Sequence, residues 1–116
     1  RDIHYELDGE FAWFVIDQKM MDDAKATNAD VEGFSDFVRT IRGVEVAMMV
    51  LENDDGSCRL NFRSKGKYVI NGVASKLGGG GHQFAAGAVV NESIGTLLSS
   101  AVEKTKSAIM TQSRQT

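Results

Sequence analysis

A run of four glycines, from Gly78 to Gly81, places the strongest constraint on how this chain of 116 residues can fold. Apolar residues at helical spacing precede the run, and an apolar segment typical of a strand follows it over residues 85–90. Glycine adopts positive φ angles and lets a ligand approach the backbone closely. The run is therefore either a flexible linker or a tight turn whose N–H groups form a concavity for an anion. We favour the binding turn, because the run lies between two apolar elements.

Positive charge gathers around the glycine run. The formal net charge of the chain is −3, but residues 56–91 contain no Asp or Glu and carry +5, which leaves −8 for the remainder. The five cationic residues of this span are Arg59, Arg63, Lys65, Lys67 and Lys76. Positive charge beside glycine amides favours an anionic ligand of limited size, because a long duplex would need a broader basic face. A solvated, lysine-rich surface is the alternative.

Two side chains in this region could contact an anion directly. His82 follows the glycines and offers an imidazole donor, or a positive charge when it is protonated. Alternation along residues 58–63 puts Arg63 on the polar face of a strand, at the strand end where ligand contacts are common. The structural alternatives are a local cap on the loop for His82 and a solvated side chain for Arg63.

The periodicity of apolar residues predicts an α/β sandwich, in which a mixed sheet of four or five strands is packed by helices. The expected strands are residues 11–17, 44–51, 58–63 and 85–90. The expected helices are residues 18–25, 31–42, 71–77 and 94–109. The strand 44–51 is apolar on both faces, so we expect it at the centre of the sheet. Turn residues at 53–56 predict a hairpin, which makes the sheet partly antiparallel.

Short polar signals mark the ends of these helices and of the chain. The expected N-caps are Asp30, Asn71 and either Asn91 or Ser93. Gly43 is the expected stop of the second helix. Residues 1–10 are predicted to form a polar leading segment, and residues 111–116 a frayed tail.

Composition sets further bounds on location and chemistry. No segment approaches the length of about 20 apolar residues that a membrane span needs, and none resembles a signal peptide. Cys58 is the only cysteine, so no intrachain disulfide can form, and a cytoplasmic location fits these features. The chain has only two histidines and lacks the Asp and His motifs that two-metal hydrolysis needs. We therefore expect no catalytic residue and no metal site within this chain.

The segment from Gly78 to Ala88, together with Phe62-Arg63-Ser64, resembles the signature of the DHH-associated domain. This domain is the C-terminal, substrate-binding half of the DHH phosphoesterases. The similarity is greatest to the bacterial oligoribonuclease and pAp-phosphatase branch, with the cyclic-di-AMP phosphodiesterases close by. It covers most of the chain, and its most specific part is the Gly-Gly-Gly-Gly-His block that Ala-Ala-Gly follows.

The resemblance implies that residues 1–116 are the substrate-binding domain of a larger, two-domain phosphoesterase. The whole enzyme would hydrolyse short oligoribonucleotides, pAp or dinucleotides. Two divalent metals, with Mn²⁺ expected, would lie in a separate catalytic domain of the same protein. The substrate ligands that the resemblance implies are Arg63, Ser64, Gly79, Gly80, Gly81 and His82. The competing hypotheses are a non-catalytic regulatory module that binds a small anionic metabolite, and a structural domain in which the glycine run is only a tight turn.

Overall fold

The computed structural model describes residues 3–19 and 28–115, which contain one six-stranded sheet. Its strands are β1 (His4–Glu6), β2 (Phe11–Ile16), β3 (Val46–Glu52), β4 (Cys58–Ser64), β5 (Gly80–His82) and β6 (Ala85–Val90). Across the sheet their order is β1-β2-β3-β4-β6-β5, and only β2 and β3 run parallel. The predicted α/β class with a mixed sheet is confirmed, with six strands in place of four or five.

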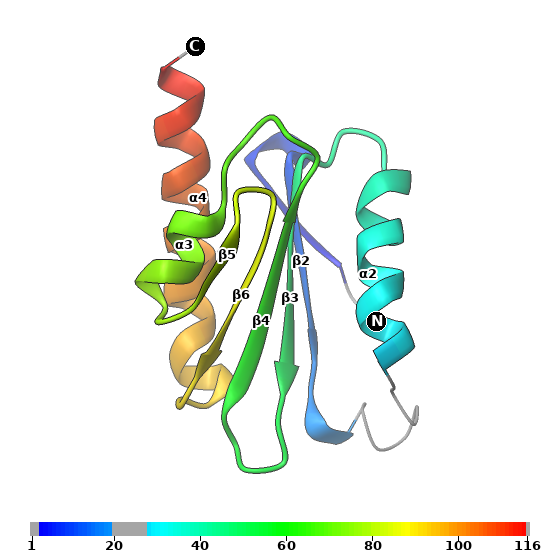
Figure 1. The fold of residues 1–116 in the computed structure, drawn as a ribbon, viewed down its shortest axis with the longest axis vertical. Coiled ribbons are helices and arrows are strands. Elements are labelled where there is room, and N and C mark those ends of the chain that lie inside the picture. The colour runs from blue at the N-terminus through cyan, green and yellow to red at the C-terminus, as the bar shows by residue number, and fades with distance from the viewer. Residues whose placement is uncertain (1–2, 20–27, 116) are drawn as a thin grey trace.

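Helices cover both faces of the sheet. Figure 1 shows α2 (Asn28–Thr40) on one side, and α3 (Asn71–Lys76) and α4 (Ile94–Arg114) on the other. Two apolar clusters result: one joins α2 to Ala47 and Met49 of β3, and the other joins α3 and α4 to Met48 and Val50. Since alternate residues of β3 serve opposite clusters, this strand is buried on both faces, as predicted for a central strand.

The predicted N-caps of α2 and α3 were wrong, the first helix starting three residues earlier than expected and the second having its N-cap one residue earlier, whereas Ser93, one of the two candidates for α4, holds the N-cap position. α2 begins at Asn28, so Asp30 lies inside the helix and is not its N-cap. Ile70 occupies the N-cap position of α3, and Asn71 is the first helical residue. Ser93 is the N-cap residue of α4, but its hydroxyl hydrogen-bonds to the Thr96 hydroxyl and not to a backbone N–H. At the starts of α3 and α4, the N-cap residue makes no side-chain cap hydrogen bond.

Two chain-end predictions also need correction. α4 extends to Arg114, where a frayed tail was expected, because the Gln112 carboxamide both accepts from Val69 N–H (2.7 Å) and donates to Val69 O (2.8 Å). Residues 4–6, expected in a leading segment, form the edge strand β1, and His4 stacks on Trp13 at 4.1 Å. The helix expected over residues 18–25 falls mostly outside the described residues.

Gly43 does not stop α2 directly. It has a φ of +88° but lies three residues beyond the last helical residue, Thr40, in the turn that leads to β3. The turn at residues 53–56 is confirmed by hydrogen bonds from Asn53 N–H to Ser57 O and from Gly56 N–H to Asn53 O. This turn joins β3 and β4 as an antiparallel hairpin.

The glycine run has two structural roles in the fold, which are to end α3 and to form β5. Gly78 has a φ of +89° and donates to Ser75 O, while Gly79 N–H donates to Ala74 O at 2.8 Å. Together these bonds form a Schellman motif, which ends α3. The second half of the run was expected as loop and is instead the strand β5, which pairs with β6. The run is therefore an ordered helix end followed by an edge strand.

Close packing explains why Gly79 has no side chain. A Cβ at this position would overlap the Gly87 carbonyl oxygen and lie 2.6 Å from Ala88 Cα, both backbone atoms of β6. At Gly80, the neighbouring glycine, a Cβ would meet nothing within 4 Å. The two positions form a matched pair for testing this packing.

We expect Gly79→Ala to destabilise the fold by about 1–3 kcal/mol, the usual cost of overpacking. Gly80→Ala should leave the free energy of unfolding nearly unchanged, because its Cβ has space. Urea unfolding of the two variants measures the difference. Equal stability of the two variants would contradict the packing that we describe.

A polar contact joins β2 to the loop after β4. The Glu10 carboxylate accepts from Lys67 Nζ at 2.9 Å and from the Tyr68 hydroxyl at 3.0 Å. Chiefly through the hydrogen bond from Lys67, the pKa of Glu10 lies below its ordinary value. The contact therefore stabilises the folded chain above the unfolded-state pKa, and this contribution is lost as the pH falls through the folded-state pKa.

Glu10→Gln should lower the free energy of unfolding at neutral pH by about 0.2–1 kcal/mol, since the pair is largely exposed. The difference from the unsubstituted chain should shrink as the pH falls through the folded-state pKa of Glu10, because the protonated carboxyl is then neutral, like the Gln carboxamide. Chemical denaturation at neutral pH and at low pH tests this. A difference that persists unchanged at low pH would assign the effect to packing.

Candidate functional site

One half of the sheet face that carries α2 has no helix over it. The register pairs Arg63, Asn61 and Arg59 of β4 with Ala85, Gly87 and Val89 of β6, and directly opposed residues share a face. The same three β4 residues also oppose Ala47, Met49 and Leu51 of β3, which belong to the apolar cluster under α2. On this face, β4 is therefore the boundary between an apolar half that α2 covers and a polar half that no helix covers.

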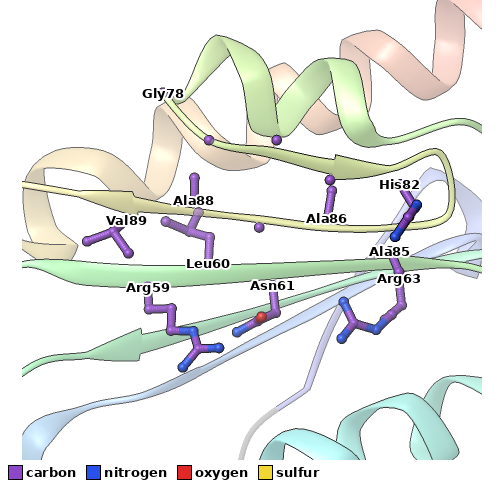
Figure 2. Close-up of a pocket in the computed structure, with 14 residues that line it drawn as sticks. Arg59, Leu60, Asn61, Arg63, Gly78, His82, Ala85, Ala86, Ala88 and Val89 are labelled. Carbon is purple, nitrogen blue, oxygen red and sulfur yellow. The ribbon is translucent and has the colours of Figure 1, made fainter.

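The uncovered half is hollowed into a pocket of about 670 Å³ (Figure 2), which we call the β4–β6 pocket. Its lining comes from β4, β5, β6 and the glycine run, and comprises Arg59–Asn61, Arg63, Gly78–His82 and Ala85–Val89. Small residues on β6 create the space. At Gly87 even a Cβ would lie 2.8 Å from the Leu60 carbonyl oxygen, so this position excludes a side chain.

The structure brings five of the six predicted site residues together. Arg63, His82 and the glycines Gly79, Gly80 and Gly81 all line the β4–β6 pocket. Figure 2 shows the His82 ring and the Arg63 side chain near one end of it. His82 is exposed, so its ring is accessible to a ligand.

Contacts within the fold restrict the position of the Arg63 guanidinium. Its Nη1 donates to the Phe62 carbonyl oxygen at 2.8 Å, and its Cζ lies 5.9 Å from the ring centroid of Phe34 on α2. Burial, followed by the positive charge of Arg59, lowers the pKa of Arg63 from its ordinary value. An anion placed between the two arginines would relieve this repulsion.

Ser64 is the predicted site residue that lies apart from the others. It lines a neighbouring hollow of about 410 Å³, together with Arg63, Lys65 and Phe84. Its hydroxyl donates to the Tyr68 carbonyl oxygen at 2.6 Å and accepts from Gly66 N–H at 3.1 Å. These bonds hold the loop after β4, so the hydroxyl has a structural task where the sequence suggested a ligand contact.

The backbone amides of the glycine run differ in what they can offer. Gly79 N–H is engaged by Ala74 O within the helix end. Ser64 N–H donates to Phe84 O, so the backbone N–H and C=O groups of Phe84 point toward β4. These groups alternate in direction along a strand, so those of Ala85 and Gly87 point toward β5. Their partners on β5 are His82 and Gly80, which leaves Gly81 N–H directed to the outer edge of the sheet.

Two polar side chains of the pocket were missing from the predicted site. Arg59 and Asn61 lie on the same face of β4 as Arg63. Alternation had placed them there, but only the strand end was interpreted as a ligand position. Asn61 gave the stronger signal for a ligand position, because it is an amide in the middle of a strand and the adjacent residues, which point to the other face, are apolar. Of the other cations in the positive span, Lys67 is paired with Glu10 and does not line the pocket.

The pocket therefore supplies positive charge and hydrogen-bond donors, which suit a phosphate oxygen. In the part of the chain that the structure describes, no three His, Cys, Asp or Glu side chains gather as a metal site. Within the same residues, no helix has the length and apolar character to cross a membrane.

Comparison with curated proteins finds relatives in bacteria. The bifunctional oligoribonuclease and PAP phosphatase NrnA of Bacillus subtilis is 48% identical over 50 residues, which are 43% of this chain and 15% of that protein. The probable bifunctional oligoribonuclease and PAP phosphatase NrnA of Streptococcus mutans is 35% identical over 77 residues, or 66% of this chain and 24% of that protein. The chain thus spans less than a quarter of the length of these two relatives.

Solved structures share the fold. An exopolyphosphatase-related protein from Bacteroides fragilis matches with a TM-score of 0.75 at 22% identity, over 95% of this chain and 31% of that chain. The C-Ala domain of alanyl-tRNA synthetase from Aquifex aeolicus matches with a TM-score of 0.61 at 16% identity, over 90% of this chain and 96% of that chain. These likenesses concern the fold alone.

A family profile matches most of the sheet and all three helices in part or in full. It is described as the DHHA1 domain, and the match extends over residues 11–111. This confirms the expected relation to the DHH-associated domains, and the chain belongs to the DHHA1 domain family.

Proposed function

We propose that this chain is the substrate-binding domain of a phosphoesterase that acts on short oligoribonucleotides, pAp or dinucleotides. The observation that carries the proposal is the β4–β6 pocket, where Arg63 and His82 meet beside the glycine run. The names of the curated relatives, bifunctional oligoribonuclease and PAP phosphatase, support this substrate class.

In this proposal the pocket holds a phosphate of the substrate. The Arg63 guanidinium can bond two phosphate oxygens at once through its planar fork. The His82 ring supplies a further donor from β5, whereas the Gly81 N–H is directed to the outer edge of the sheet, away from the pocket. Ser64 supports the site indirectly, because the two hydrogen bonds of its hydroxyl hold the loop that follows Arg63.

Hydrolysis in this proposal belongs to a separate domain of the same protein. That domain would carry two divalent metals, with Mn²⁺ expected, and would face the β4–β6 pocket across the substrate. Two metals held about 3.5–4 Å apart stabilise the attacking and leaving oxygens of such a reaction. Closure of the two domains would align the captured phosphate with the metals. A cytoplasmic location is part of the proposal and accords with the buried free thiol of Cys58.

Arg63→Ala should weaken binding of adenosine 3′,5′-bisphosphate roughly 10- to 150-fold, because a hydrogen bond to a charged group is worth about 1.5–3 kcal/mol. Calorimetric or NMR titration of the 116-residue chain measures this. Arg114→Ala is the matched control, since Arg114 lies at the end of α4 and lines a different hollow. If the two substitutions weaken binding equally, the attraction is general electrostatics and the Arg63 assignment is wrong.

His82→Ala should reduce affinity for the same ligand by roughly 10-fold or more, because the ring would donate to a charged phosphate oxygen, and such a bond is worth about 1.5–3 kcal/mol. Thermal stability should hardly change, because the side chain is exposed. A loss of stability with unchanged affinity would instead identify His82 as a local cap on the hairpin. Failure of the unsubstituted chain to bind the bisphosphate, a linear diadenylate or inorganic phosphate would favour a purely structural domain.

A further inference from the structure

The most unusual group in the described residues is the side chain of Asn61. It is only 6% exposed, and its Nδ2 is buried with no hydrogen-bond partner among the described residues. A buried amide donor without an acceptor is unfavourable, because it has lost its hydrogen bonds to water and gained none in return. Asn61 also lines the β4–β6 pocket, from the middle of β4. A ligand in the pocket could supply the acceptor that the fold does not.

The neighbours of Asn61 specify what kind of acceptor this would be. Arg59 and Arg63 lie two residues away on either side, about 6.6–6.8 Å along the strand, and on the same face. Figure 2 shows Asn61 between them, with both guanidinium groups directed toward it. Amide and guanidinium groups all donate hydrogen bonds, so the row favours an anionic oxygen.

The neighbouring strand β6 leaves space beside this row, and Arg59 is exposed within it. Gly87 faces Asn61 across the sheet, and a Cβ there would already lie 3.5 Å from Asn61 Oδ1. His82 lies beside Ala85, the partner of Arg63, at the far end of the row from Arg59. Arg59 and Asn61 are thus separated along the sheet from the place where Arg63 and His82 would hold the first phosphate.

We propose that Arg59 and Asn61 form a second phosphate subsite, so that the pocket selects nucleotides with two phosphate groups over mononucleotides. This rests on the proposed function, in which Arg63 and His82 hold the first phosphate. Asn61 Nδ2 donates to an oxygen of the second phosphate, and Arg59 supplies the compensating charge. The ligand class is a bisphosphorylated nucleotide or the backbone of a short oligoribonucleotide.

The test compares adenosine 3′,5′-bisphosphate with adenosine 5′-monophosphate as ligands of the 116-residue chain, by NMR titration. The bisphosphate should bind roughly 10-fold or more tightly than the monophosphate, as expected for one added charged hydrogen bond. The side-chain amide resonance of Asn61 should shift with the bisphosphate and stay in place with the monophosphate.

Three substitutions separate the two subsites. Arg59→Ala and Asn61→Leu should each lower bisphosphate affinity about 10-fold and leave monophosphate affinity within about 2-fold. Lys76→Ala, which removes a charge outside the pocket, is the control and should change neither. Asn61→Leu should also melt at the same or a higher temperature, because Leu has a similar size and leaves no unpaired donor. A merely structural Asn61 would lose stability and keep both affinities.

The outcomes distinguish this inference from the function on which it rests. Equal affinities for the two ligands, or a bisphosphate affinity that Arg59→Ala leaves unchanged, would overturn the second subsite and leave the first intact. Arg63→Ala should weaken both ligands. If neither ligand binds the unsubstituted chain, the proposed function fails, and the second subsite fails with it.

Discussion

The pocket depends on how closely the glycine run can approach β6. Gly79 packs against backbone atoms of Gly87 and Ala88 at distances that no side chain could share. This contact holds β5 against β6, and β5 carries His82 to the pocket. Without the close approach, the wall formed by the glycines would move away from β4. The shape of the β4–β6 pocket is therefore built on a contact between backbones.

The same contact reconciles two interpretations of a glycine-rich segment. As a helix stop, the run needs a positive φ at Gly78 and a free backbone to bond Ser75 and Ala74. As a pocket wall, it needs bare main chain beside the ligand. Gly78 and Gly79 end the helix and also line the pocket, and the following Gly80 and Gly81 line the pocket. A linker would require neither, and the hydrogen bonds of Gly78 and Gly79 are those of an ordered turn.

Much of the fold could be predicted from the sequence, because apolar periodicity reports burial directly. The central strand β3 and the alternating strand β4 were both evident, and their faces were assigned correctly for Met48 and Phe62. Helix starts were less predictable: at Asp30 and Asn71, a residue that can cap a helix lies inside one. The short edge strands β1 and β5 were missed because three residues carry too little pattern.

Sequence and geometry agree in bringing Arg63 and His82 to one pocket, and their role as ligand contacts stays a prediction. The hydrogen bonds of the Ser64 hydroxyl could not be predicted, because they depend on the path of the following loop. Asn61 shows a different limit. Its position on a face was readable from alternation, but the lack of a partner for its buried amide became apparent only with the neighbours in place.

The sheet has an apolar centre, yet it is bounded at both edges by strands of only three residues. Exposed edges of flat, apolar sheets are templates on which further chains add and aggregate. Here β1 and β5 offer too few backbone groups for a second molecule to extend the sheet, and glycine in β5 weakens strand pairing further. Short edge strands thus limit the backbone that is open to sheet extension, while the glycine run still leaves bare main chain along the β4–β6 pocket.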